Sequence, residues 1–278
     1  MHTDQIMQLA LDMAGLTEIP EDTQVYVPGE ITKALVCIDA DAGLLSIARD
    51  LRFDGVIVHH PQGDDAMLNL HLIMNRQLQT LRKAGVPEDE AREALRPRQF
   101  GVERNNHMRN WDYMPSVARL MGMPFMNVHY PCDLMMERIV DAHVQRRLGE
   151  IGSAATVQEL TNILLELPEY AHARTRPAIV VGDPGAPAGK VVTAFAGGTN
   201  GGVAVVEAYW HHGAGTVMTL HMEVADILKL RQSEVKGTLV VAGHIACDSV
   251  GLNAFIRVLR ASGLNLTPTG GIVPGAQG

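Results

Sequence analysis

Short apolar runs alternate along this chain with segments whose apolar positions recur every three or four residues. Residues 6–13 have apolar side chains at that helical spacing, which predicts an amphipathic helix ended by Gly15. The apolar runs 33–39 and 55–58 predict two strands, and the segment 42–52 between them has the spacing of a helix. A strand, a helix and a second strand in this order predict a βαβ unit with parallel strands.

The alternation continues after an interruption. Residues 64–123 are helical in pattern and rich in charge, which predicts a helical insertion or lid. Further strands are predicted over 124–128, 178–181, 190–194, 216–220 and 238–242, and further helices over 134–148, 201–212, 224–232 and 249–261. The residues Thr156 and Glu159 form a capping box that opens one more helix. The pattern therefore predicts an α/β fold of two lobes, 1–150 and 151–278, with mixed or parallel sheets flanked by helices.

Composition narrows the class of protein. With 278 residues, 46% of them hydrophobic and 19% charged, the chain can bury a core, which excludes wholesale disorder. A net charge of −8 and an aromatic content of only 4% argue against a nucleic-acid partner. The N-terminal residues are polar and no apolar run approaches the about 20 residues of a membrane span, so we expect a cytoplasmic protein without a membrane partner. The three cysteines are far apart and fit neither a disulfide framework nor a zinc knuckle.

Residue types that bind metals follow three of the predicted strands. His59 and His60 come directly after the run 55–58, and the chain contains 12 histidines in all. His129 and Asp133 follow the strand 124–128, and His244 and Asp248 follow the strand 238–242. Imidazole and carboxylate groups suit zinc, iron or manganese.

Each stretch alone also has an ordinary structural explanation. One histidine of the pair could lie on the surface and the other in the core. Asp133 and Asp248 could each cap the helix that follows. Three such stretches at strand ends favour a shared site, because the carboxyl ends of parallel strands gather at one edge of a sheet. His221 and Glu223 follow the strand 216–220, where the start of a helix is the ordinary explanation.

These motifs resemble those of the NGG-interacting-factor-three (Nif3-like) family, whose members are also called GTP cyclohydrolase 1 type 2 homologues. The matching residues are Val58-His59-His60-Pro61, His129 with Asp133, and Ala242-Gly243-His244 with Asp248. Residues 27–39 look like the family's opening strand, and 197–202 resemble its glycine-rich turn. His221 and Glu223 match a segment that faces the family's cleft, which makes them weaker candidates for the site. The resemblance covers about 1–63 and 124–262.

The resemblance implies a Nif3-like fold, in which two α/β lobes surround a central metal-binding cleft, and a homo-oligomer that is often a hexameric ring. It also implies two divalent metal ions per chain, zinc, iron or manganese, held by His59, His60, Asp133, His244 and Asp248. His129 matches a motif histidine that either contacts a metal or stands behind a ligand. This chain departs from the family at Asp248, where a glutamate is usual, at Gln62-Gly63-Asp64, where an apolar pair is usual, and in the long stretch 64–123.

The resemblance and the ligand-rich strand ends together suggest a dinuclear metal-dependent hydrolase of GTP cyclohydrolase-like type that uses metal-activated water. We expect a small-molecule substrate such as a nucleotide. Catalytic roles are predicted for Asp248 and for His129, which would orient a ligand or shuttle a proton. The alternative is a non-catalytic metal-binding protein that serves as a regulator or scaffold in a ring oligomer.

Overall fold

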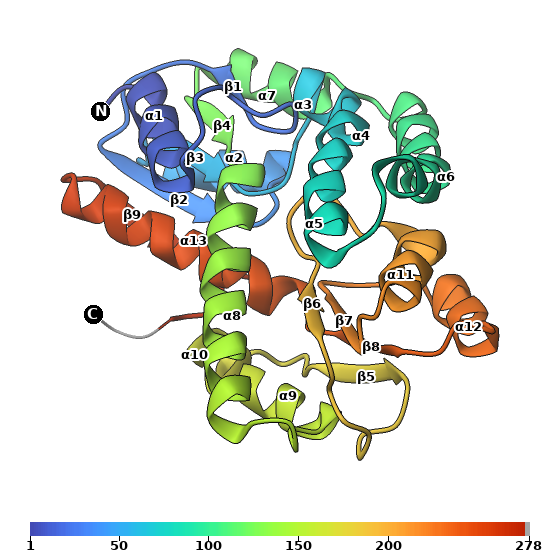
Figure 1. The fold of residues 1–278 in the computed structure, drawn as a ribbon. Helices are drawn as coiled ribbons and strands as arrows, with labels where there is room; N and C mark the ends of the chain where they lie inside the picture. Colours follow the sequence, from blue (N-terminus) through green and yellow to red (C-terminus); the bar gives the residue numbers. More distant parts are fainter. Residues whose placement is uncertain (276–278) are drawn as a thin grey trace. The chain divides into compact units, whose positions relative to one another are not determined.

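The α/β class predicted from the sequence is confirmed by a computed structural model, which describes residues 1–275 and contains two mixed sheets flanked by helices (Figure 1). The chain divides into two compact units. Among the described residues, the first unit comprises 1–73, 102–136 and 248–272, and the second comprises 74–101, 137–247 and 273–275. The division into lobes at residue 150 stays a prediction.

The first unit is built on a five-stranded sheet in the order β1-β4-β3-β2-β9. Its strands are β1 (Gln24–Val27), β2 (Lys33–Cys37), β3 (Gly55–Val58), β4 (Phe125–Asn127) and β9 (Asn265–Pro268). The central strands β2, β3 and β4 are parallel, whereas β1 is antiparallel to β4 and pairs Gln24 with Asn127. Because β9 is also parallel to β2, the carboxyl ends of four parallel strands and the residues that precede β1 meet at one edge of the sheet.

Helices cover this sheet because successive strand residues point to opposite faces, and the central strands have apolar residues on both faces. The helices wholly within the first unit are α1 (Thr3–Ala14), α2 (Ala42–Asp50), α3 (Asp64–Leu68), α4 (Leu70–Ile73) and α7 (Tyr113–Met121). Leu35, Cys37, Val56 and Val58 form a buried cluster with residues of α2 and α7. Gly15 ends α1 in the left-handed conformation with φ 68°, as the sequence predicts.

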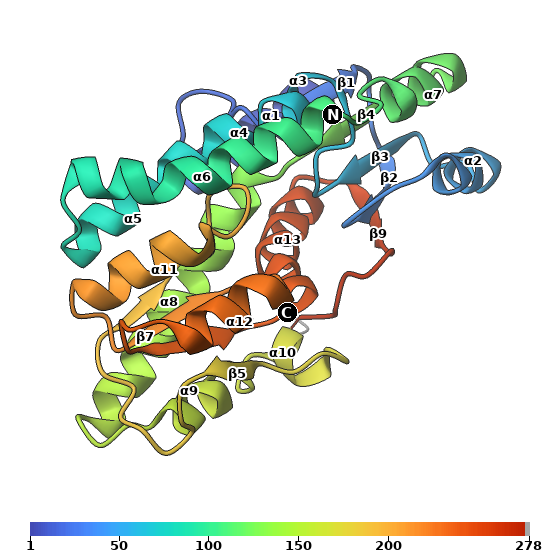
Figure 2. The same ribbon diagram turned by 90° about the vertical axis from the view of Figure 1, so that its right-hand side faces the viewer.

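The second unit is also built on a sheet, which has four strands in the order β5-β8-β7-β6 (Figure 1), and Figure 2 shows its strands β5 and β7 in a second view. The strands are β5 (Ala178–Val181), β6 (Val191–Thr193), β7 (Thr216–Thr219) and β8 (Thr238–Val241), and β5 alone is antiparallel to its neighbour. Its helices are the 3₁₀ turn η1 (Met74–Arg76), α5 (Gln77–Ala84), α9 (Val157–Leu164), α10 (Pro168–His172), α11 (Gly202–His211) and α12 (Val224–Gln232). The predicted capping box of Thr156 and Glu159 is present at the start of α9.

Three long helices contribute residues to both units: α6 (Glu88–His107), α8 (Tyr130–Ile151) and α13 (His244–Ala261). Sequence patterns did not indicate β1, β9 or α10. β9 has only one buried side chain and ends in a proline, so it lacks the alternation typical of a strand. Across residues 1–275, no helix is both long and apolar enough to cross a membrane.

Candidate metal centre

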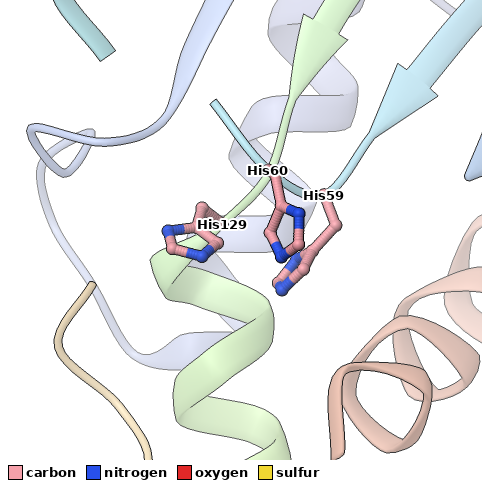
Figure 3. A group of neighbouring side chains, drawn as sticks. All are labelled: His59, His60 and His129. Atoms are coloured by element: carbon pink, nitrogen blue, oxygen red, sulfur yellow. The ribbon is translucent and has the colours of Figure 1, made fainter. Parts of the chain in front are cut away.

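The sheet edge of the first unit brings the candidate histidines together. His59 and His60 follow β3 directly, and His129 lies between β4 and α8. Figure 3 shows the three imidazole rings gathered beside the first turn of α8. The ring centroid of His59 lies 5.0 Å from that of His60 and 4.8 Å from that of His129. One ring nitrogen from each histidine lies within 4.8 Å of the other two, which is close enough for a shared ion.

Each ring is held through its Nδ1 atom by a different partner. His59 Nδ1 lies 3.1 Å from the Val128 carbonyl oxygen. His60 Nδ1 lies 2.9 Å from Asp39 Oδ1, and His129 Nδ1 lies 2.6 Å from Asp22 Oδ2. Because every Nδ1 is engaged in this way, the Nε2 atoms are the ring nitrogens available to a ligand.

Two buried carboxylates complete the group. Asp133 lies in the first turn of α8 and Asp248 is the fifth residue of α13. Neither is therefore the N-cap residue of its helix, which was the alternative that the sequence left open. The Asp133 side chain is 3% exposed, that of Asp248 1% and that of His59 0%. The distance from His59 Nε2 to Asp133 Oδ1 is 3.3 Å, and that from His60 Nε2 to Asp248 Oδ2 is 3.4 Å.

These contacts fit a metal ion better than they fit direct hydrogen bonds. Within the described part of the chain, His59 Nε2 and Asp133 Oδ1 are buried without a hydrogen-bond partner, although such atoms are costly to leave unsatisfied. Two ligands at about 2.0–2.1 Å from one ion in tetrahedral geometry lie about 3.3 Å apart, which matches the observed separations. The group of His59, Asp133 and Asp248 could therefore hold an ion.

The electrostatics of the group also favour a cation. Burial disfavours the charged form of His59, but the carboxylates of Asp248 and Asp133 outweigh it and raise the pKa of that imidazole. The pKa of His60 is raised as well, because the carboxylates of Asp248 and Asp39 outweigh its burial. The negative field that stabilises protonated imidazole would stabilise a divalent ion in the same place.

Asp22 and Asp39, which orient two of the rings, were not predicted as site residues. Asp39 ends a strand that the sequence did predict, so its place at the sheet edge could have been inferred. Asp22 lies in the loop before β1 and is 107 residues from its partner His129. Only the antiparallel pairing of β1 with β4 places it there, and nothing in the local pattern indicates this pairing.

The remaining candidates belong to the second unit. His244 is the first residue of α13, and its ring centroid lies 4.8 Å from that of His221. Asn200 Nδ2 lies 3.4 Å from His221 Nδ1 and donates to Glu223 Oε2 at 3.1 Å. Arg98 forms an ion pair with Glu223. The predicted place of His244 in the ligand set stays a prediction.

Solved structures with the same fold are known. A NIF3 superfamily protein from Sphaerobacter thermophilus has 37% identity and a TM-score of 0.94 over 98% of each chain. Reduced HcgD from Methanocaldococcus jannaschii has 13% identity and a TM-score of 0.60 over 96% of this chain and 97% of that one. A Bacillus cereus protein related to NIF3 has 9% identity and a TM-score of 0.54 over 97% and 96%. No protein-family model matches the chain, and no curated protein is similar enough to match.

Proposed function

The chain belongs to the NIF3 superfamily, and on that premise we propose that it is a metal-dependent hydrolase that binds two divalent ions through His59, His60, Asp133 and Asp248. His244 precedes Asp248 by one helical turn in α13 and stays a predicted ligand of the same set. Zinc, iron and manganese all suit a mixture of imidazole and carboxylate ligands.

The observation that carries the proposal is the placement of the Asp248 carboxylate. Its Oδ1 lies 3.7 Å from His59 Nε2, and its Oδ2 lies 3.4 Å from His60 Nε2. Each oxygen therefore faces a different imidazole, so this carboxylate could supply a ligand atom beside each of the two rings. Although aspartate is one methylene shorter than the glutamate usual in the family, its two oxygens reach both rings.

A bound divalent ion would polarise a substrate and lower the pKa of a water molecule towards about 7. The protein's own contribution is to hold the ligands in place. Asp39 and the Val128 carbonyl fix the rings of His60 and His59, so little reorganisation is needed when an ion enters. The two carboxylates lower the net charge of the centre, and their burial strengthens their attraction to the ions.

The finer parts of the proposal rest on the family. We propose a small-molecule substrate such as a nucleotide, and assembly of the chain into a ring-shaped homo-oligomer. The catalytic roles of His129 and Asp248 stay predictions. Both residues belong to the first unit, and both lie beside the candidate ligands.

Metal analysis of the purified protein tests the binding step. We expect one to two equivalents of a transition metal per chain, falling below half an equivalent in His59→Ala. The matched control is His71→Ala, because His71 lies on α4 outside the candidate ligand groups, with its Nδ1 3.1 Å from the Leu68 carbonyl oxygen. A metal content that is equal in the wild type and in His59→Ala would contradict the assignment.

A second assay separates a hydrolase from a regulator or scaffold. The metal-loaded protein is incubated with nucleotides, phosphoesters and cyclic amides, and product formation is measured. We expect turnover of one class that Asp248→Ala abolishes and His71→Ala preserves. Metal binding without turnover of any class would favour the regulatory or scaffold function.

A further inference from the structure

Asp22 is a fully buried carboxylate that no sequence motif indicates. It lies between α1 and β1, at the edge of the first sheet where the candidate metal ligands gather, and its exposed fraction is 0%. The ring of His129 is its one ion-pair partner within residues 1–275, at 2.6 Å from Nδ1 to Oδ2. A buried carboxylate is costly unless it is paired, so the contact with His129 has to offset the cost of burying Asp22.

The loop that contains Asp22 holds His129 at two points. Thr23 Oγ1 accepts a hydrogen bond from the backbone N–H of His129 at 3.2 Å, while Asp22 binds the ring. The loop itself is anchored by Asn127, whose Nδ2 donates to the Asp22 carbonyl at 2.7 Å. Thr23 Oγ1 also donates to Asp22 Oδ1 at 3.1 Å, which fixes the carboxylate plane. Both the backbone and the ring of His129 are thus oriented by neighbouring residues of one loop.

The three histidines of the centre differ in the partner of Nδ1. His59 has a neutral carbonyl, and His60 has Asp39, whose side chain is 68% exposed and is screened by solvent. Only His129 has a carboxylate that is wholly buried, where a charge acts through a low dielectric. A hydrogen bond from Nδ1–H to such a carboxylate is the strongest of the three and is the most demanding about ring orientation.

We infer that Asp22 is a positioning residue that makes His129 a metal ligand through Nε2, in addition to His59, His60, Asp133 and Asp248. The inference rests on the proposed metal binding. When Nδ1–H donates to Asp22, Nε2 keeps its lone pair and is the ring nitrogen that can bind an ion. Carboxylate, imidazole and ion in series form a common arrangement in metal sites.

The position of the ring favours a ligand over a carrier of protons to solvent. A ring nitrogen of His129 belongs to the three-imidazole group in which all ligand atoms lie within 4.8 Å of one another. Its side chain is only 8% exposed. His129 Nε2 also lies 3.8 Å from Asp133 Oδ2, on the far side of the ring from Asp22.

The first test compares Asp22→Asn with Asp50→Asn in a chelator-competition measurement of the metal dissociation constant. Asp50 is an exposed aspartate of the same unit that pairs with Arg49, so its substitution controls for the loss of one charge. Loss of a carboxylate behind a ligating histidine weakens metal binding by about 10–100-fold. We expect that loss in Asp22→Asn and a change below about twofold in Asp50→Asn. Equal affinities in a folded Asp22→Asn and the wild type overturn the inference.

A double-mutant cycle shows whether Asp22 acts through His129. We expect His129→Ala to weaken metal binding at least tenfold, and addition of Asp22→Asn to His129→Ala to weaken it no further. Additive losses would mean that Asp22 acts on general structure, and unchanged affinity in His129→Ala would leave that ring as a proton carrier. Either result overturns the inference.

A measurement on the wild type alone keeps the inference testable if Asp22→Asn fails to fold. Nitrogen-15 NMR of the metal-free protein distinguishes the two ring nitrogens of each histidine. We expect the hydrogen of His129 on Nδ1, because a bare Nδ1 cannot donate to Asp22. A neutral ring with its hydrogen on Nε2 overturns the inference. A wild-type protein that binds no metal refutes the proposed function, whereas the NMR result still decides the role of Asp22.

Discussion

Gly251→Ala tests whether the close approach of two helix segments sets the geometry of the metal centre. Gly251 lies on α13 one turn after Asp248, and it packs against Cys132, the residue before Asp133 in α8. A Cβ atom at position 251 would lie 2.3 Å from the Cys132 carbonyl oxygen and 3.2 Å from Met136 Cβ. The absence of a side chain at Gly251 therefore brings Asp133 and Asp248 to the same group.

The size of the effect follows from this distance. A carbon atom and a carbonyl oxygen in contact lie about 3.3 Å apart, so the two segments must separate by about 1 Å. Overpacking of this kind costs about 1–3 kcal/mol. Metal ligands tolerate displacements of only about 0.2 Å, so the affinity for the ion should fall at least about tenfold, or about 1.4 kcal/mol.

The assay pairs Gly251→Ala with Gly149→Ala. Gly149 lies within α8, and a Cβ atom there would meet nothing within 4 Å. Alanine at this position should be neutral or stabilising by up to about 1 kcal/mol, because it favours the helix. Urea denaturation gives the free energy of unfolding, and chelator competition gives the metal dissociation constant. A Gly251→Ala protein with both quantities equal to those of Gly149→Ala would refute the reasoning.

Three further predictions concern stability. Metal at about one hundred times its dissociation constant should add about 2.7 kcal/mol to the free energy of unfolding. In differential scanning fluorimetry this corresponds to a rise in Tm of about 5–10 °C, and a chelator should reverse both changes. Burial opposes the charged form of Asp54, but hydrogen bonds from Thr32 and from the backbone of Lys33 prevail and lower the pKa of that carboxyl. Asp54→Asn should therefore cost about 1 kcal/mol at pH 7. The stabilisation is present above the ordinary pKa of 3.8 and is lost as the pH falls through the lowered pKa. Urea titrations of the variant and the wild type should therefore converge at acid pH. Thr156→Ala should cost about 1 kcal/mol in urea denaturation, because the Thr156 side chain accepts a hydrogen bond from the Glu159 backbone in the capping box of α9; an unchanged midpoint would contradict this.

Much of the fold follows from local patterns, because most strands and helices have their own periodicity. The run 55–58 is a strand with the predicted bounds, and all four of its side chains are buried. The sequence did not indicate β1 and β9, which are stabilised by pairing with strands that are distant in the chain. β9 pairs with β2 across more than two hundred residues, and only the folded sheet makes its largely exposed Asn-Leu-Thr-Pro segment a strand.

The candidate site shows the same division between local and distant information. His59 and His60 could be predicted because they follow a recognisable strand, and parallel strands place such residues at one edge. Asp248 could be predicted only as one of two alternatives, a ligand or a helix cap, until the start of α13 at His244 excluded the cap. Asp22 has no local signal, because its role depends on a contact across 107 residues.

Anomalous scattering from crystals of the metal-containing protein tests the central claim most directly, because it locates and identifies ions in one experiment. Data collected on both sides of a metal absorption edge should give two difference peaks beside the Asp248 carboxylate. One peak should lie within about 2.0–2.2 Å of His59 Nε2 and Asp133, and the other at the same distance from His60 Nε2. Fully occupied metal peaks elsewhere, with none beside His59, Asp133 and Asp248, would contradict the account.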